Sequence, residues 1–209
     1  MSESREHMLN KIKQALSIKV SVPFSTVPYN PPHFMPSKEE LEVEFAENFS
    51  GLLGKFSYCV NSEELVLQLH SLIEKRSWSR IYCRDEALKS FLEKNGCNIY
   101  YSDDLNNCDV AITDCEFLVA RTGSMLLSSG QQSGRTVSVY APIHICIAKT
   151  SQLVYDIDDA LQQMKLRYGN NLPSLMSFAT GPSRTADIEK TLVVGVHGPK
   201  EVFCFLIDE

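Results

Sequence analysis

Residues 56–101 read FSYCVNSEELVLQLHSLIEKRSWSRIYCRDEALKSFLEKNGCNIYY, and this stretch decides the fold class. Short apolar runs alternate here with longer amphipathic segments. One amphipathic segment begins at Asn61-Ser62-Glu63-Glu64, a helix-capping pattern, and the next ends at Asn95-Gly96, a helix stop signal. Strands and helices that alternate at this spacing predict a parallel sheet covered by helices. The predicted strands are 56–60, 80–83 and 98–101, and the second helix spans 85–94.

The segment that follows has a different rhythm. Residues 109–113, 117–121 and 124–129 resemble strands but are separated by too few residues for a helix, so some of them must pair antiparallel. We therefore predict an α/β three-layer, Rossmann-like fold with a mixed sheet. Its remaining predicted elements are strands 136–140, 143–149, 175–180 and 202–207, a helix over 156–167, and a helix whose first turn is 185–188.

The first 55 residues predict a helical arm. Residues 3–16 place Met8, Ile12 and Leu16 on one helical face, and residues 22–36 contain five prolines, which exclude a helix. A capping box at residues 37–40 predicts a second helix that extends to residue 54. We expect an N-terminal arm over 1–55, used for packing or partner contact, and a domain over 56–209.

Composition narrows the class of protein. The 209 residues include 20 Lys and Arg against 26 Asp and Glu, a net charge of −6, which argues against nucleic acid as the main ligand. We expect no membrane span, because no apolar run approaches 18 residues, and no secretory signal at the start. The seven cysteines include no CxxC pair, so we expect reduced, mostly buried thiols in a cytoplasmic protein and no metal or cofactor bound by this chain.

Residues 180–189, TGPSRTADIE, are the strongest candidate for a ligand site. A small-residue loop that enters a helix exposes free backbone N–H groups, which could hold a phosphate or carboxylate together with Gly181, Ser183 and the Arg184 guanidinium. Asp187 follows in the same segment. The alternative is a capping serine and a surface arginine paired with Asp187 or Glu189.

Two further loops are candidates for anion binding. Residues 129–135 form a glycine-flanked polar loop that ends in a basic group, although a plain strand connection would look the same. The other loop follows an apolar strand and begins with an arginine, which needs either a ligand or a salt-bridge partner. The candidate residues are Ser129, Gly130, Ser133, Gly134 and Arg135 in the first loop and Arg121, Thr122 and Gly123 in the second.

Two histidines complete the candidate ligand-binding residues. His144 lies within a predicted buried strand, and His197 lies on a turn beside glycine and proline. Each is either a ligand contact or a structural residue. No nucleophile elbow is present, so no motif points to a hydrolase, and no catalytic residue is assigned.

Five of these motifs together resemble the LUD-domain family, most closely its lactate-utilisation C members. They are residues 120–129 (ARTGSMLLSS), 134–135 (GR), 142–145 (PIHI), 180–189 and 195–199 (GVHGP). The resemblance is strong over residues 108–209. It implies a fold like that of sugar-phosphate isomerases and CoA-transferases.

The resemblance also implies a function. This is a role in oxidising L-lactate to pyruvate beside an iron–sulfur subunit that supplies the cluster. Family members generally have a glutamate before the Thr-Gly pair, whereas this chain has Arg121, so a carboxylate nucleophile is missing there.

Two functional hypotheses follow. In the first, the chain is a subunit that supports lactate oxidation through iron–sulfur lactate-utilisation partners. In the second, it is a stand-alone enzyme or sensor that binds a small carboxylate, a sugar phosphate or an acyl-CoA.

Overall fold

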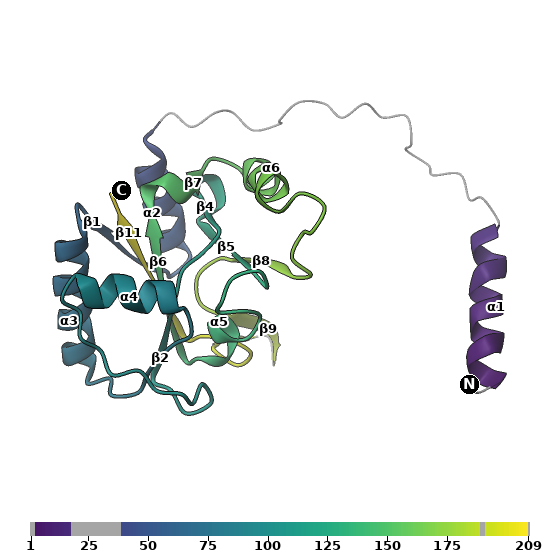
Figure 1. Ribbon diagram of the computed structural model, residues 1–209, viewed down its shortest axis with the longest axis horizontal. Helices are drawn as coiled ribbons and strands as arrows, with labels where there is room; N and C mark the ends of the chain where they lie inside the picture. The colour runs from purple at the N-terminus through teal and green to yellow at the C-terminus, as the bar shows by residue number, and fades with distance from the viewer. Residues whose placement is uncertain (1–2, 18–38, 189–190, 209) are drawn as a thin grey trace. The chain divides into compact units, whose positions relative to one another are not determined.

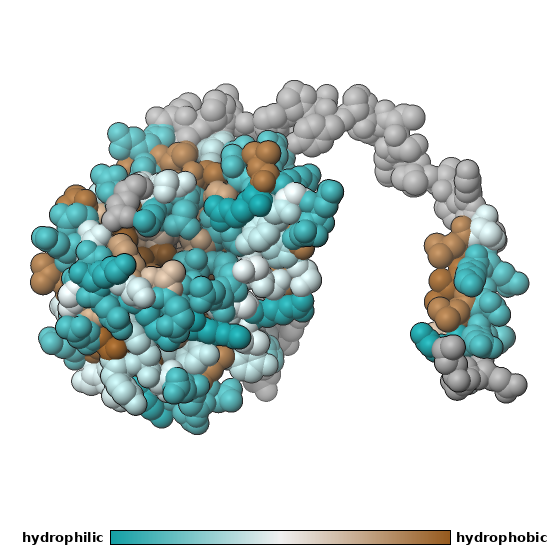
Figure 2. All heavy atoms as spheres, in the orientation of Figure 1, coloured by the Kyte–Doolittle hydropathy of each residue, from teal (hydrophilic) through white to brown (hydrophobic). Residues whose placement is uncertain are grey.

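The computed structural model describes residues 3–17, 39–188 and 191–208, and the chain divides into two units, 1–35 and 36–209. The described part of the first unit is α1 (Glu3–Ser17) (Figure 1). Its apolar side chains gather on one side of the helix, with hydrophilic residues opposite (Figure 2). The large apolar side chains exposed on α1 are Met8, Leu9, Ile12 and Leu16.

A five-stranded parallel sheet forms the centre of the second unit. The predicted cap starts the first of its helices, because Asn61 Oδ1 accepts a hydrogen bond from Glu64 N at 2.9 Å. The second begins in the same way, since Asp85 Oδ1 accepts a hydrogen bond from Leu88 N at 2.9 Å. Both helices cover one face of the sheet (Figure 1). The strand order is β1 (Lys55–Cys59), β11 (Glu201–Ile207), β6 (Ile143–Lys149), β3 (Val110–Thr113) and β2 (Ile81–Cys83), and the helices are α3 (Ser62–Arg76) and α4 (Glu86–Lys94).

A second sheet of four strands covers the other face. β4 (Phe117–Val119) and β5 (Ser124–Ser128) pair antiparallel, as predicted. The sheet is completed by β8 (Met176–Ala179), antiparallel to β5, and by β7 (Leu153–Val154), parallel to β4. α6 (Ile157–Tyr168) packs on its outer side through Ala160 and Met164. The predicted mixed α/β class is confirmed. The strands of the five-stranded sheet are all parallel, whereas the four-stranded sheet contains both parallel and antiparallel pairs.

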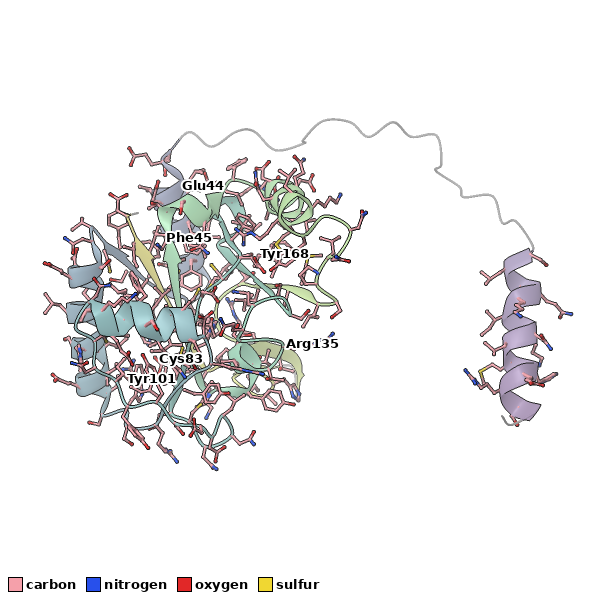
Figure 3. The ribbon with its side chains drawn as sticks, viewed as in Figure 1. Glu44, Phe45, Cys83, Tyr101, Arg135 and Tyr168 are labelled. Atoms are coloured by element: carbon pink, nitrogen blue, oxygen red, sulfur yellow. The ribbon has the colours of Figure 1, made fainter. Side chains whose placement is uncertain are left out.

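α2 (Leu41–Gly51) packs with this second unit, although the sequence analysis placed it in the N-terminal arm. Phe45 (labelled in Figure 3) and Phe49 are completely buried. Their rings stack with centroids 5.4 Å apart. They pack with Leu118, Met125 and Cys146 between the two sheets. Two phenylalanines at i and i+4 therefore make this helix part of the core.

Three segments differ from their predicted structure. Residues 137–140 form a short helix, α5 (Val137–Tyr140), because Val137 packs into a buried cluster with Cys108 and Ala111 beside β3. Residues 98–101 contribute a single bridge from Tyr101 to Ile81. Residues 185–188 belong to β9 (Arg184–Ile188), which pairs antiparallel with β10 (Thr191–Val194), so no helix begins there. The two short 3₁₀ turns are η1 (Ala120–Thr122) and η2 (Thr150–Gln152).

All seven cysteines are buried and unpaired. Cys146 and Cys204 face each other across β6 and β11 within the core between the two sheets. The predicted burial of the thiols is confirmed.

Candidate functional site

A pocket of about 250 Å³ opens between the two sheets, at the amino-terminal ends of β6 and β11. Side chains from both sheets and two loops line it. Four of the predicted ligand-binding residues, distant in sequence, meet there: His144, Gly181, Ser183 and His197. The other lining residues are Leu127, Ser138, Val139, Ser177, Ala179, Thr180, Pro182, Gly198, Pro199 and Val202.

The two sequence motifs around residues 181 and 197 form one wall of this pocket. Ser183 N donates to Pro199 O at 2.9 Å, and Gly195 N donates to Ser183 O at 2.9 Å, which ties the two loops together. Gly181 has a φ of +71°, and a Cβ there would lie 2.4 Å from Leu52 O. Only glycine fits this close approach to the turn after α2.

His144 is the buried polar group of the pocket, with 1% of its surface exposed. Its Nε2 lies 2.8 Å from Thr113 Oγ1, and the Thr113 hydroxyl donates to Asp114 O at 2.8 Å. Burial lowers the pKa of His144 below its ordinary value, so the imidazole is neutral near pH 7.

Arg184 does not line the pocket. It is exposed, begins β9, and donates from Nη2 to the carbonyl oxygen of Leu52. The predicted helix start at 185–188 is wrong, because pairing with β10 replaces the helix, and a role for Arg184 in anion binding stays a prediction without that helix N-terminus. The side chain of Asp187 lies outside those that the structure describes.

The loop over residues 129–135 also lies away from the pocket. Ser129 Oγ accepts a hydrogen bond from Leu175 N at 3.2 Å, and Arg135 donates to Ser174 Oγ. A Cβ on Gly130 would lie 2.7 Å from the Tyr168 hydroxyl, while Ser133 is buried and Gly134 has a φ of +67°. These contacts fit a strand connection.

The segment Arg121-Thr122-Gly123 contacts α2 and α6. Arg121 Nη2 donates to Asp156 Oδ1 at 2.6 Å, the salt-bridged alternative read from the sequence. Gly123 has a φ of +59°, and a Cβ there would lie 2.5 Å from Phe49 N. Thr122 Oγ1 donates to Ser124 Oγ at 2.8 Å, which lies 2.7 Å from Thr180 Oγ1 at the pocket. This hydroxyl chain connects the segment to the site.

A wider groove of about 460 Å³ adjoins the pocket and shares Val139, His197 and Gly198 with it. Tyr140, Pro142 and Val196 give it apolar walls, and Lys200 adds a positive charge.

A separate crevice of about 260 Å³ lies at the carboxyl ends of the parallel strands, where sequence reasoning placed no site. Asp85 follows β2, Asp114 follows β3 and Lys149 ends β6. Burial, with the nearby charge of Asp85, raises the pKa of Asp114 to about 7. The sequence signal that could have located this crevice is an aspartate within two residues of the end of each of two neighbouring strands.

Asp114→Asn should make the protein more stable at pH 8. The folded chain binds a proton at Asp114 that the unfolded chain releases at its ordinary pKa of about 3.9, so this group lowers stability as pH rises from 4 through 7. Asparagine removes that penalty and still accepts from Gln131 Nε2, which donates to Asp114 Oδ1 at 2.7 Å. We expect a gain of about 2 kcal/mol at pH 8 and little change at pH 4, measured by urea unfolding.

The control for this prediction is Asp103→Asn, at an exposed position. It should leave the pH dependence of unfolding unchanged. If D114N and the native chain had the same free energy of unfolding at both pH values, ionisation of Asp114 would not destabilise the folded protein.

Two findings concern metals and membranes. Among residues 3–17, 39–188 and 191–208, no three His, Cys, Asp or Glu side chains come together in a way that could bind a metal ion. Within the same described segments, no helix is both long and apolar enough to cross a bilayer.

Comparison with known proteins gives one family and one fold. The LUD domain model matches residues 99–207. A Lactate utilization protein C from Shouchella clausii is 30% identical over 187 residues, covering 83% of this chain and 81% of that protein. Another, from Halalkalibacterium halodurans, is 31% identical over 153 residues, covering 69% of this chain and 66% of that protein.

Some of these relatives are matched over only part of their length. A Lactate utilization protein C from a Geobacillus strain is 37% identical, but the match covers 54% of this chain and 46% of that protein. A crystal structure of a DUF162 family protein from Deinococcus radiodurans superposes with a TM-score of 0.62 at 15% identity, covering 83% of this chain and 99% of that one. At that identity the likeness shows the fold alone.

Proposed function

Because the chain belongs to the LUD-domain family, we propose that it acts in lactate utilisation, as a cytoplasmic subunit that supports oxidation of L-lactate to pyruvate. The observation that carries the proposal is the pocket between the sheets, whose lining residues all lie within the matched segment 99–207. Relatives that share this segment are named Lactate utilization protein C.

The chemistry of the pocket supports a small ligand that carries hydroxyl and carboxylate groups. Hydroxyl side chains dominate its polar lining, and none of its lining residues is an arginine or lysine. An anionic group in the pocket would therefore be held by hydroxyl donors and not by a charged side chain. Arg135 and Arg184, the predicted anion-binding arginines, are bonded to Ser174 and to the Leu52 carbonyl.

The redox centre in this proposal belongs to an iron–sulfur partner subunit. The seven cysteines of this chain contain no CxxC pair, the spacing typical of cluster ligands. The exposed apolar side of α1 offers a surface for such a partner, because Ile12 and Leu16 are 49% and 77% exposed.

A second candidate is stand-alone binding of a small carboxylate, as an enzyme or a sensor. The same pocket favours it, since the lining groups could bind a ligand without any partner. The two candidates differ in whether an iron–sulfur protein is required.

Deletion of the gene should abolish growth on L-lactate as sole carbon source and leave growth on pyruvate unchanged. The full chain should restore growth and should co-purify with an iron–sulfur protein, identified by its absorption and by mass spectrometry. A chain that lacks residues 1–35 tests whether α1 is needed for that association. Normal growth of the deletion strain on lactate would overturn the proposal. A strain that fails to grow, from which the chain purifies alone, would favour the stand-alone candidate.

A further inference from the structure

The hydrogen bonds around His144 favour one of its two tautomers. Thr113 Oγ1 lies 2.8 Å from both Asp114 O and His144 Nε2. The carbonyl oxygen can only accept, so the single hydroxyl proton satisfies it when Thr113 Oγ1 in turn accepts from His144 Nε2. In that arrangement the neutral imidazole has its proton on Nε2 and an unprotonated Nδ1. His144 also lines the pocket.

We infer that His144 Nδ1 is the acceptor for the hydroxyl group of a 2-hydroxycarboxylate bound in this pocket. The inference rests on the proposed function and names the feature of the ligand that is recognised. A nitrogen lone pair attracts an O–H donor and repels a carbonyl oxygen. A hydroxy acid such as L-lactate meets this requirement, while the keto acid pyruvate presents only acceptors to Nδ1.

The rest of the pocket is suited to the other parts of such a ligand. The hydroxyls of Ser138, Ser177 and Ser183 belong to residues that line the pocket, and each can donate to a carboxylate. Leu127 and Val202 supply apolar surface for a short carbon chain. Pockets of this kind discriminate strongly, because an analogue without the hydroxyl leaves a buried polar group unpaired.

The tautomer can be measured without any ligand. In ¹⁵N-histidine-labelled full-length protein, long-range ¹H–¹⁵N spectra distinguish protonated from unprotonated ring nitrogens. We expect His144, identified by the signal lost in His144→Gln, to show an unprotonated Nδ1 and a protonated Nε2 at pH 7. A protonated Nδ1 would overturn the inference.

Ligand recognition is tested on the same sample. Saturating L-lactate should move the His144 Nδ1 resonance upfield, as expected when a lone pair accepts a hydrogen bond. Propionate, which lacks the hydroxyl, and pyruvate should leave it in place. An equal shift with all three acids, or no shift with lactate, would contradict the assignment.

Variants provide an independent measurement by calorimetric titration. His144→Gln keeps an Nε2 donor for Thr113 but removes the acceptor at Nδ1, so lactate affinity should fall about tenfold, the equivalent of a single hydrogen bond. Propionate affinity should not change. Thr113→Val removes the group that fixes the tautomer and should weaken lactate binding with a mixed Nδ1 signal. His70→Gln, on α3, is the matched control and should bind lactate normally.

These outcomes are distinguishable from those of the growth experiment. A deletion strain that fails on lactate, combined with a His144 that does not respond to lactate, would retain the proposed function and remove the hydroxyl recognition. A strain that grows normally, combined with a lactate-dependent Nδ1 shift, would retain the recognition and remove the role in growth.

Discussion

A chain that lacks residues 1–55 should lose cooperative thermal unfolding, while one that lacks only residues 1–35 should melt at the temperature of the full chain. The longer deletion removes α2 and with it Phe45 and Phe49, both completely buried. Losing one buried phenylalanine side chain costs about 3–5 kcal/mol, and a whole domain is stable by only about 5–15 kcal/mol. Removal of both therefore consumes most or all of the available stability.

The measurement is differential scanning calorimetry of the two truncations beside the full chain. The shorter deletion is the matched control, since both lack α1 and residues 18–35 but only one lacks α2. A sharp transition in the 56–209 fragment would show that the arm extends through residue 55 and that the two sheets fold without the helix.

Glu116→Ala should destabilise the protein by about 2–4 kcal/mol, because two hydroxyl donors lose their buried acceptor and a cavity is left behind. Glu116 is 2% exposed and accepts hydrogen bonds from Ser128 Oγ at 2.6 Å and Tyr168 OH at 2.7 Å. Its other oxygen pairs with Arg167. Alanine leaves these donors without an acceptor and opens a cavity between β5 and α6. Urea unfolding of the purified variant gives the value.

Glu116→Gln is the matched control, because glutamine fills the same volume and still accepts through one oxygen. It should cost less than half as much as alanine. Arg167→Ala should also be milder, since the Arg167 side chain is 46% exposed and the remaining carboxylate keeps its two hydroxyl donors. If all three variants lowered the free energy of unfolding equally, the loss would not be explained by the volume of the Glu116 side chain or by its hydrogen bonds.

Local signals in the sequence predicted much of the fold because tertiary contacts agree with them. Asn61 caps α3 with its own side chain, and its preference for that position needs no distant partner. In β6 the continuous apolar run from Ile145 to Ala148 matches a strand buried on both faces. Helix and strand assignments of this kind rest on the residues themselves.

The errors occurred where a distant segment decided the local structure. Residues 185–188 follow a sequence typical of a helix start, yet β10 offers a hydrogen-bonding edge that a local pattern does not reveal. The same reasoning applies to the site. Gly181 and His197 were identified from composition, but their meeting with His144 depends on the pairing of β6 with β11. The role of Asp114 depends equally on α4, which brings Asp85 beside it.

The strand order has a consequence for synthesis of the chain. β11, formed by residues 201–207, lies between β1 and β6, so the second position of the five-stranded sheet stays empty until these residues have left the ribosome. Until then β1 and β6 each present an unpaired, apolar edge. Exposed edges of this kind are sites of aggregation, and contacts between residues this distant in sequence form slowly. The nascent protein is therefore most vulnerable before residues 201–207 are available, when a chaperone that shields strand edges would have its greatest effect on yield.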